Sequence, residues 1–270
     1  MRADRTLAPF GRRPATITAR AAHGAYVVLH ADDPGGPRPE PGQFYMLTAG
    51  ERWGGGDGER PFLPRAFSVL RAPAGTDELQ FMVEDVGPGT RRLTELDAGD
   101  ELLLVGPLGI GFRAPRDGRR PLLVGGGVGV APLAIWQDKL SGAANPLLGF
   151  RDEAHARGAA LLANVAVATD DGSIGHHGLV TELLEDQLDQ DGHAEIYACG
   201  PPAMLEAVRA IAAATAVPAQ LALESGMACG FGACFGCVVP TKTGYLRLCV
   251  DGPVVDADKL ETALVAGAGH

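Results

Sequence analysis

A chain of 270 residues with 46% hydrophobic residues is long enough for two modest domains and a small appendage, each with its own core. The formal net charge of −10 argues against nucleic acid as a partner, because phosphate binding needs clustered lysines and arginines. No apolar run reaches the length of a membrane span, and the basic N-terminus lacks the apolar centre of a signal peptide, so we expect a cytoplasmic protein.

Short apolar runs bounded by turn residues fill the chain from about residue 15 to residue 105. Their regular spacing is typical of the strands of an all-β barrel or sandwich. In chain order the runs are ATITARAA, AYVVLHA, QFYMLTA, RAFSVL, ELQFMVEDV and ELLLVG. A Gly-rich polar segment, residues 49–64, separates two of them, and we expect it to be a loop that is mobile or contacts a partner. These patterns predict a β-barrel domain over residues 1–116.

Two short motifs in this first domain suggest a flavin site. Arg65-Ala-Phe-Ser68 offers a cation for a pyrophosphate and a hydroxyl for the edge of an isoalloxazine ring. Gly87-Pro-Gly-Thr90 precedes a predicted helix start, where free N–H groups can bind a phosphate. An isolated R-x-F-S has almost no specificity, so neither motif identifies a flavin site by itself.

The pattern changes after Asp117, where buried strands begin to alternate with helical patterns. This alternation predicts a parallel α/β sheet with helices on both faces. The predicted strands are PLLVGGG, NPLLGFR, NVAVATDD, AEIYACGP and AQLALE, and the predicted helices are VAPLAIWQDKL, GLVTELLEDQL and PAMLEAVRAIAAAT. We assign residues 117–218 to this domain and residues 219–270 to a cysteine-bearing tail.

Two glycine turns follow strands of the α/β domain, at GGGVGVAP and CGPP. The first lies between a strand and a helix, where N–H groups and the helix dipole favour a pyrophosphate, although its spacing departs from G-x-G-x-x-G and a merely tight turn looks the same. Ligands of parallel sheets bind at the carboxyl ends of the strands, so the two turns together favour a nucleotide site. The residues expected there are Gly125, Gly126, Gly127, Gly129, Pro132, Cys199, Gly200 and Pro201.

Two aspartates and a lone thiol refine this expected nucleotide site. Asp170 and Asp171 follow the strand NVAVAT and are either a solvated acidic turn or acceptors for ribose hydroxyls. In the second case they repel a 2′-phosphate and favour NADH over NADPH. Cys199 is either a small buried hydrophobic residue or part of a nicotinamide pocket.

The stretch CGFGACFGC holds three of the five cysteines, Cys229, Cys234 and Cys237. The spacing C-x4-C-x2-C with Cys249 further on is the plant-type [2Fe–2S] ligand pattern. A disulfide scaffold is disfavoured by the low, odd cysteine count, and a structural zinc site by the single C-x-x-C pair without a nearby histidine. Glycines between the thiols allow the backbone to wrap closely around a cluster.

Taken in order, RAFSV, GPGT, GPLGIGF, GGGVGVAPL, TDDGS, YACGP and the cysteine segment with LCVDGPVV resemble the ferredoxin reductase superfamily. More closely, the chain looks like the electron-transfer subunits of two-subunit, NAD-dependent dihydroorotate dehydrogenases. The resemblance implies an FAD-binding β-barrel, an NAD-binding α/β domain and a C-terminal [2Fe–2S] loop, in a heterotetramer with an FMN-containing catalytic subunit. It places flavin contacts at Arg65, Phe67, Ser68, Met82, Val83, Glu84, Gly89 and Thr90, and cluster ligands at Cys229, Cys234, Cys237 and Cys249.

Two features depart from the resemblance. Phe67 stands where flavodoxin-reductase relatives often have tyrosine, so no phenol can hydrogen-bond the flavin there, and the Gly-rich insertion before Arg65 alters the surface that a partner meets.

Electron counting links the three expected cofactors. NADH delivers two electrons as a hydride and the cluster accepts one at a time, so a flavin is needed between them. We expect an oxidoreductase that moves electrons between NAD(H) and the partner's FMN in pyrimidine biosynthesis, with no base for dihydroorotate chemistry in this chain. The alternatives are a reductase subunit of another complex, of hydrogenase or ferredoxin:NADP oxidoreductase type, and a colourless, zinc-stabilised interaction module.

Overall fold

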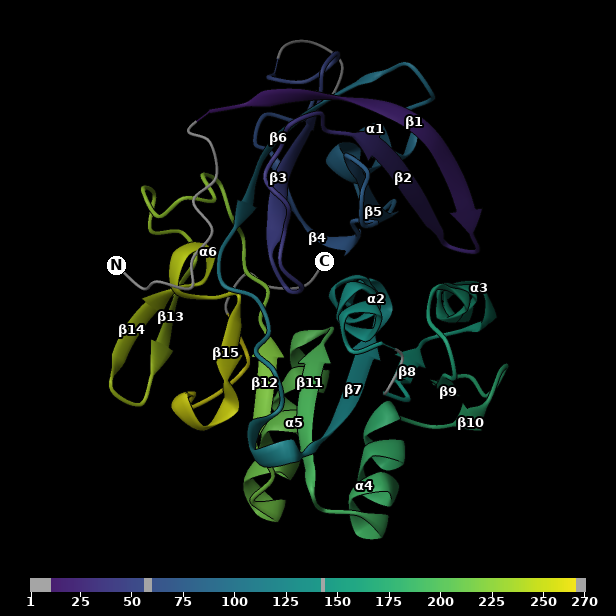
Figure 1. Cartoon of the computed structure of the whole chain (residues 1–270), viewed down its shortest axis with the longest axis vertical. Helices are drawn as coiled ribbons and strands as arrows, with labels where there is room; N and C mark the ends of the chain where they lie inside the picture. The colour runs from purple at the N-terminus through teal and green to yellow at the C-terminus, as the bar shows by residue number, and fades with distance from the viewer. Residues whose placement is uncertain (1–10, 56–59, 142–143, 266–270) are drawn as a thin grey trace.

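A closed antiparallel barrel of six strands forms the first part of the computed structural model, which describes residues 11–55, 60–141 and 144–265. The strands pair in the order β1-β2-β5-β4-β3-β6, which confirms the predicted barrel (Figure 1). Alternate side chains such as Leu47, Phe81 and Leu104 point inwards and are fully buried. The elements are β1 (Arg13–His23), β2 (Tyr26–Asp32), β3 (Phe44–Ala49), β4 (Arg65–Arg71), β5 (Glu78–Glu84), α1 (Pro88–Thr94) and β6 (Glu101–Leu108).

A seven-stranded sheet in the order β10-β9-β8-β7-β11-β12-β15 follows the barrel, as predicted. Its strands are parallel except for β15, which pairs antiparallel with β12. The strands are β7 (Arg120–Gly126), β8 (Leu147–Phe150), β9 (Ala166–Thr169), β10 (His176–His177), β11 (Ala194–Cys199), β12 (Ala219–Ala222) and β15 (Val254–Asp256). The helices are η1 (Arg116–Gly118), η2 (Gly127–Gly129), α2 (Val130–Lys139), α3 (Glu153–Ala156), η3 (Arg157–Leu161), α4 (Val180–Gln190), α5 (Pro202–Thr215) and η4 (Ala257–Lys259).

Helices cover both faces of this sheet, because its central strands are apolar on both sides. On β7, Leu122 and Val124 pack into the cluster that contains α4 and α5, whereas Leu123 packs into the cluster that contains α2. Helix α2 lies between the sheet and the barrel (Figure 1). The carboxyl ends of β7 and β11 point towards the barrel (Figure 1).

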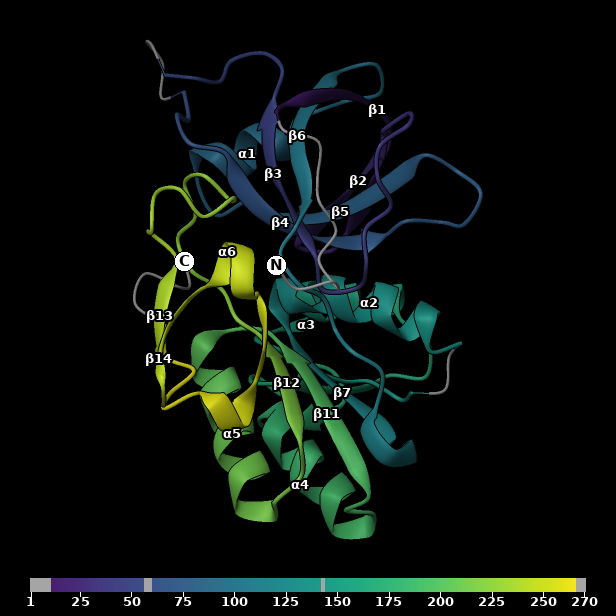
Figure 2. The ribbon, with the colours of Figure 1, turned by 60° about the vertical axis from the view of Figure 1, so that its left-hand side comes forward.

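The last part of the chain is shared between the sheet and an outlying hairpin (Figure 2). Strands β12 and β15 belong to the sheet, while β13 (Val238–Thr241), β14 (Gly244–Arg247) and α6 (Leu248–Asp251) lie beside it. The predicted division at residue 218 thus falls just before a strand of the same sheet, and the domain limits stay a prediction.

Buried polar groups fasten the linker between the domains to the sheet. The carboxylate of Glu195 is fully buried and accepts hydrogen bonds from Arg116 N (2.7 Å) and Gln220 Nε2 (2.8 Å). Arg116 also pairs with Asp256 of β15 at 2.8 Å. Because a buried carboxylate needs partners of this kind, the linker, the sheet and the C-terminal segment are held in one fixed arrangement.

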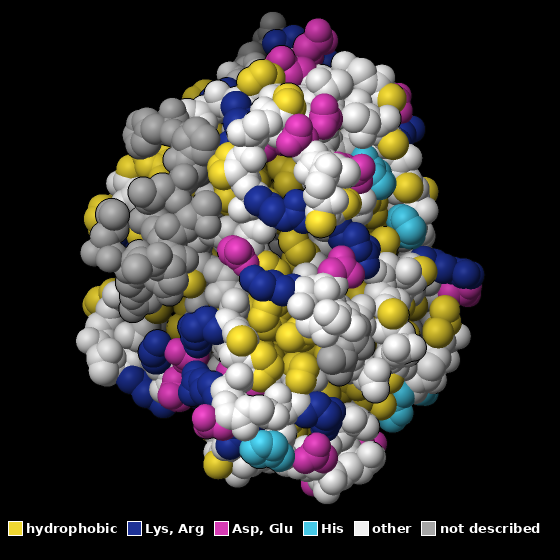
Figure 3. Space-filling model, viewed as in Figure 1, with side chains coloured by type: hydrophobic (Ala, Val, Ile, Leu, Met, Phe, Trp, Pro, Cys, Tyr) yellow, Lys and Arg dark blue, Asp and Glu magenta, His cyan; other side chains and the backbone are white. Residues whose placement is uncertain are grey.

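Charged side chains of both signs alternate over the face in Figure 3. Many charged side chains of the described residues are paired, such as Arg71 with Asp138 and Arg120 with Asp191. The described residues of this face form no continuous basic surface of the kind that binds nucleic acid. No helix among the described residues is long and apolar enough to cross a membrane.

Of the Gly-rich segment 49–64, residues 56–59 lie outside the described residues. The N–H of Gly54 donates to the carbonyl of Pro61 at 2.9 Å, so the two ends of the loop are tied together. Its contact with a partner stays a prediction.

Candidate functional site

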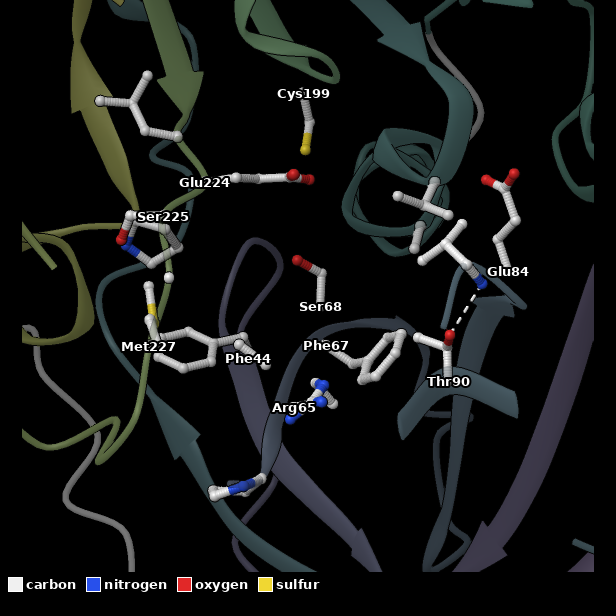
Figure 4. A pocket seen from close by; sticks show the side chains of 18 of the residues that line it. Phe44, Arg65, Phe67, Ser68, Glu84, Thr90, Cys199, Glu224, Ser225 and Met227 are labelled. Atoms are coloured by element: carbon white, nitrogen blue, oxygen red, sulfur yellow. Dashed lines mark hydrogen bonds between the residues drawn. The ribbon is translucent and has the colours of Figure 1, made fainter. Parts of the chain in front are cut away.

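A cavity of about 600 Å³ lies where the barrel, the α/β domain and the C-terminal segment meet (Figure 4). Its volume suits a cofactor-sized ligand. The barrel contributes Phe44, Leu63, Pro64, Arg65, Ala66, Phe67, Ser68, Met82, Glu84, Val86 and Thr90. The α/β domain contributes Val128, Ala131 and Cys199, and the C-terminal segment contributes Leu223, Glu224, Ser225, Gly226, Met227, Ala228, Gly236 and Pro253.

Arg65 provides the cation of the barrel wall. Its guanidinium lies against Gly89, where an added Cβ would come within 2.6 Å of Arg65 Nε. It also lies over the ring of Trp53, 5.9 Å from the centroid, and donates to Leu63 O at 2.6 Å. Among the described residues the partners of Arg65 are this carbonyl and this ring, so its charge is available to an anionic group in the cavity, such as a pyrophosphate.

Thr90 fixes the turn that begins α1. Its hydroxyl accepts from Val86 N at 2.9 Å and donates to Gly87 O at 3.0 Å. Thr90 therefore shapes the cavity wall, while Phe67 and Ser68 project from β4 towards the interior (Figure 4). Ser68 points to the side on which Glu224 and Cys199 lie.

Cys199, which is buried, and Glu224, which is half-buried, are neighbouring ionisable groups in the opposite wall. Burial raises the pKa of the Cys199 thiol well above its ordinary value, and the charge of Glu224 raises it further. Burial also raises the pKa of Glu224. The thiol therefore stays protonated at neutral pH, and it is not a nucleophile here.

Ser225 carries a buried hydroxyl that has no hydrogen-bond partner among the described residues, although the residue lines the cavity. A buried polar group without a partner is costly, so this hydroxyl is a candidate hydrogen-bond partner for a polar group of a bound cofactor. With the cation of Arg65 and the apolar walls, the residues present fit a flavin and a nicotinamide ring.

Most glycines of the turn after β7 allow close packing, whereas the sequence predicted that they contact a nucleotide. A Cβ added at Gly125 would meet Leu148 and Leu133, one at Gly126 would meet Met204, and one at Gly129 would lie 2.2 Å from Cys199 O. At Gly127, with φ of +54°, the nearest atom to an added Cβ is 4.0 Å away. The turn thus lets α2 start close to the end of β11, and Gly127 is its open position.

The other predicted nucleotide residues lie at the same sheet edge but do not line the cavity. Pro132 is buried in α2, and Pro201 begins the turn into α5 beside Gly200. Asp170 and Asp171 are exposed at the end of β9, and the carboxylate of Asp171 accepts from Ser173 N at 3.0 Å. Their contact with a ribose stays a prediction.

The four remaining cysteines form two pairs in the C-terminal segment. Cys237 and Cys249 are buried with their sulfurs 3.2 Å apart, too long for a disulfide bond of about 2.05 Å. Cys229 Sγ accepts from Cys234 N at 3.5 Å, and Cys234 Sγ accepts from Gly236 N at the same distance. Backbone N–H groups thus already point at sulfur, as they do around iron–sulfur clusters.

The thiols differ in how readily they ionise. Burial raises the pKa of Cys229, but N–H donors from Cys234 and Phe231 outweigh it and lower that pKa to about 6. Burial raises the pKa of Cys249 to about 12, with a further contribution from Cys237. Because cluster ligands are thiolates, the positive irons of a bound cluster have to supply the charge that stabilises the second pair.

The described residues place no three Cys, His, Asp or Glu side chains around a point suited to a single metal ion. A [2Fe–2S] cluster instead distributes four thiolates over two irons, two on each. The pairs Cys229–Cys234 and Cys237–Cys249 fit that division better than they fit one zinc ion.

Some of the residues predicted to contact cofactors line the cavity, while their contact with a cofactor stays a prediction. Seven predicted residues line it: Arg65, Phe67, Ser68, Met82, Glu84, Thr90 and Cys199. Val83 is buried in the barrel core instead. Glu224, Ser225 and Phe44 were missed, although Glu224 and Ser225 follow the predicted strand AQLALE at the edge where ligands of parallel sheets bind.

Comparisons with known proteins agree with this architecture. Residues 224–261 match the iron–sulfur cluster binding domain of dihydroorotate dehydrogenase B. A solved structure of an NADH-dependent reduced ferredoxin–NADP oxidoreductase superposes with a TM-score of 0.77 at 25% identity, covering 94% of this chain and 92% of that one. A ferredoxin–NADP⁺ reductase from Neisseria gonorrhoeae, solved with bound FAD and NADP, shares the fold with a TM-score of 0.60 at 20% identity, covering 76% of this chain and 91% of that one.

Two curated relatives carry the name dihydroorotate dehydrogenase B (NAD(+)), electron transfer subunit. The one from Caldanaerobacter subterraneus is 37% identical over 232 residues, which are 83% of this chain and 88% of the relative. The one from Geobacillus thermodenitrificans is 38% identical over 234 residues, which are 82% of this chain and 86% of the relative. The chain belongs to the family of electron transfer subunits of dihydroorotate dehydrogenase B.

Proposed function

We propose that the chain moves electrons between NAD(H) and an FMN-containing dihydroorotate dehydrogenase catalytic subunit, through FAD and a [2Fe–2S] cluster. The observation that carries this proposal is the shared cavity. Arg65 and Ser68 of the barrel, Val128 of the nucleotide turn and Met227 of the cysteine-bearing segment all line it. One space thus borders the barrel strand with the flavin motif, the glycine turn after β7 and the segment that carries the four cysteines.

Each wall of the cavity has a separate task in this function. Arg65 binds the flavin pyrophosphate, Ser68 hydrogen-bonds the isoalloxazine edge, and Gly127 receives the nucleotide pyrophosphate. Bound FAD supplies the chemistry that converts a two-electron hydride into single electrons. Cys199, as a neutral thiol, and Glu224 line the side of the cavity that we assign to the nicotinamide ring.

Cys229, Cys234, Cys237 and Cys249 are the proposed cluster ligands. Ala228 and Gly236, which adjoin two of them, line the cavity, so a cluster held there lies beside the flavin. Cys234 is exposed, and it gives the cluster an edge that a partner can approach. We place the FMN subunit on that side, in a heterotetramer of two chains of each kind, and in the cytoplasm, where thiols stay reduced.

Reconstitution tests this function. The purified chain is expected to hold about one FAD and one [2Fe–2S] per chain and to reduce dyes with NADH, but not to oxidise dihydroorotate. Adding the catalytic subunit is expected to create NAD⁺-linked dihydroorotate oxidation. Zinc in place of iron, or dihydroorotate oxidation by the chain alone, would contradict the proposal. Coupling to a hydrogenase partner instead would favour the other reductase type.

A further inference from the structure

Arg151 lies at the centre of the sheet edge where the nucleotide is expected. It directly follows β8, and the register pairs Gly126 of β7 with Gly149, and Phe150 with Thr169 of β9. Neighbouring strands are about 4.8 Å apart. Arg151 therefore stands between the glycine turn, which is the proposed pyrophosphate site, and Asp170, which is the proposed ribose site.

An arginine in this position ordinarily accommodates the 2′-phosphate of NADP(H). Here its guanidinium already has partners. Arg151 Nη2 donates to Glu84 Oε1 at 2.6 Å, and Arg151 Nε donates to His155 Nε2 at 2.9 Å. A carboxylate oxygen of Asp152 lies 3.8 Å from Nε. The charge of Arg151 is thus neutralised, mainly by a residue of the other domain, since Glu84 ends β5 of the barrel.

The neighbouring side chains hold Glu84 and Arg151 in this arrangement. His155 is nearly buried, and its ring bridges two carboxylates beside Arg151: Nδ1 lies 2.6 Å from Asp152 Oδ1 and Nε2 lies 3.2 Å from Glu84 Oε1. The ring of Tyr26 packs edge-on against His155 at 5.6 Å. Glu84 and His155 are the packed groups, and they position the guanidinium of Arg151, whose own side chain is 62% exposed.

The surroundings of Arg151 are otherwise acidic. Asp170 and Asp171 end the next strand, and Asp152 begins α3. Hydrogen bonds from Ser173 lower the pKa of Asp171, and the charge of Asp152 acts in the opposite direction, so these two carboxylates are close enough to repel. Among the described residues, a 2′-phosphate at this edge would meet three carboxylates, and the nearby cation of Arg151 is already paired.

We propose that Glu84 is a specificity-determining residue, which selects NAD(H) over NADP(H) by neutralising Arg151 across the domain boundary. The inference rests on the proposed function and deepens it: the flavin domain, and not only the nucleotide domain, sets the choice of nucleotide. Asp170 and Asp171 repel the 2′-phosphate, and Glu84 removes the one nearby cation that would otherwise attract it.

Equilibrium binding tests this with Glu84→Gln, which keeps the shape of the side chain and removes its charge. Isothermal titration of NAD⁺ and NADP⁺ into the FAD- and cluster-loaded protein needs no turnover. Because exposed charge pairs change an equilibrium constant by up to about fivefold, we expect NADP⁺ to bind roughly fivefold more tightly and NAD⁺ to change much less. The gain should disappear in the double variant with Arg151→Met.

Glu153→Gln is the matched control, because it removes the same charge from α3, where Glu153 pairs with Arg157. It should leave the ratio of the two affinities unchanged. Arg151→Met alone is a second, independent test. It leaves the charge of Glu84 unpaired, so we expect NADP⁺ to bind more weakly than it binds to the wild type, while the affinity for NAD⁺ changes little. If Glu84→Gln loses FAD, this variant decides the question.

Two outcomes would overturn the proposal. One is an unchanged NADP⁺ affinity in Glu84→Gln, and the other is an equal loss of both nucleotides in Arg151→Met, which would make Arg151 a pyrophosphate ligand. In either case NADH reduction of the wild-type flavin would still support the proposed function. Failure of NADH to reduce that flavin would instead contradict the function itself.

Discussion

Many of the residues that line the cavity lie at or beside the ends of strands. The cysteine loop, residues 229–237, contains no strand, and its described contacts include glycine turns and N–H···S hydrogen bonds near 3.5 Å. Behind the cavity lie the barrel interior and both cores of the sheet. The middle of the loop has little packing, because Cys234 and Phe235 are exposed and Phe235 has a positive φ of +58°, whereas Cys237 at its end is buried in the core. We therefore expect the flavin site to be folded in the absence of FAD, whereas the cysteine loop becomes ordered only when the cluster binds.

The largest expected effect comes from a substitution that alters the cysteine loop and leaves the flavin cavity unchanged. Cys234→Ser should bleach the cluster while FAD stays bound, because an exposed ligand is lost and no cavity wall changes. Visible absorption and the EPR signal of the reduced protein report the cluster, and released flavin reports FAD. Cys199→Ser is the control, since this thiol lies outside the loop and should leave the cluster intact. Simultaneous loss of both cofactors from Cys234→Ser would show that the two regions are one folding unit.

The reverse experiment removes the cation of the cavity. Arg65→Met should weaken FAD binding by about 10- to 100-fold, which corresponds to the loss of a hydrogen-bonded charge. Flavin fluorescence on dilution measures the affinity, and the cluster spectrum should not change. Arg20→Met, on the outer surface of the same barrel where Arg20 pairs with Asp97, should bind FAD normally. An Arg65 variant with wild-type affinity would remove this residue from the flavin site.

A smaller effect is expected at the nucleotide edge. NADH should reduce the flavin faster than NADPH, and Asp171→Asn should narrow the difference by up to about fivefold, the range of one exposed charge. Stopped-flow bleaching of the flavin with each nucleotide gives both rates. Equal rates in the wild type, or no change in the variant, would assign Asp171 to a solvated turn.

The smallest predicted effect concerns the pH dependence of stability. Burial raises the pKa of Glu224 above its unfolded value, so its contribution is fully present below the unfolded pKa of about 4.3 and is lost as pH rises through the folded pKa. Glu224→Gln, which cannot ionise, should therefore gain stability relative to wild type as the pH is raised from 5 to 8. Urea midpoints of the two proteins across this range measure the difference. A constant difference would mean that Glu224 titrates normally.

The same contrast explains what could be predicted from the sequence. The four cluster cysteines fall within 21 residues, so their spacing alone carries the ligand pattern. The β-barrel and the parallel α/β sheet could also be predicted, because the spacing of apolar residues that identifies a strand or a helix involves only neighbouring residues. Glu224 and Ser225 were missed because their position depends on β12 pairing beside β11. Gly125, Gly126 and Gly129 were expected to face a nucleotide, yet each is required by close packing that no motif reveals. The contact between Glu84 and Arg151 joins two domains and had no signal in the sequence.

The relay itself is tested most directly in the complex with the catalytic subunit, by comparing wild type with Cys234→Ser in two assays. One assay follows NAD⁺-linked dihydroorotate oxidation, and the other follows NADH-dependent dye reduction at the flavin. If electrons pass through the cluster, the first rate should fall by more than about 100-fold, beyond the loss typical of residues around a metal ligand, while dye reduction persists. Full NAD⁺-linked turnover by Cys234→Ser would contradict the relay and leave the cysteine loop with a structural role.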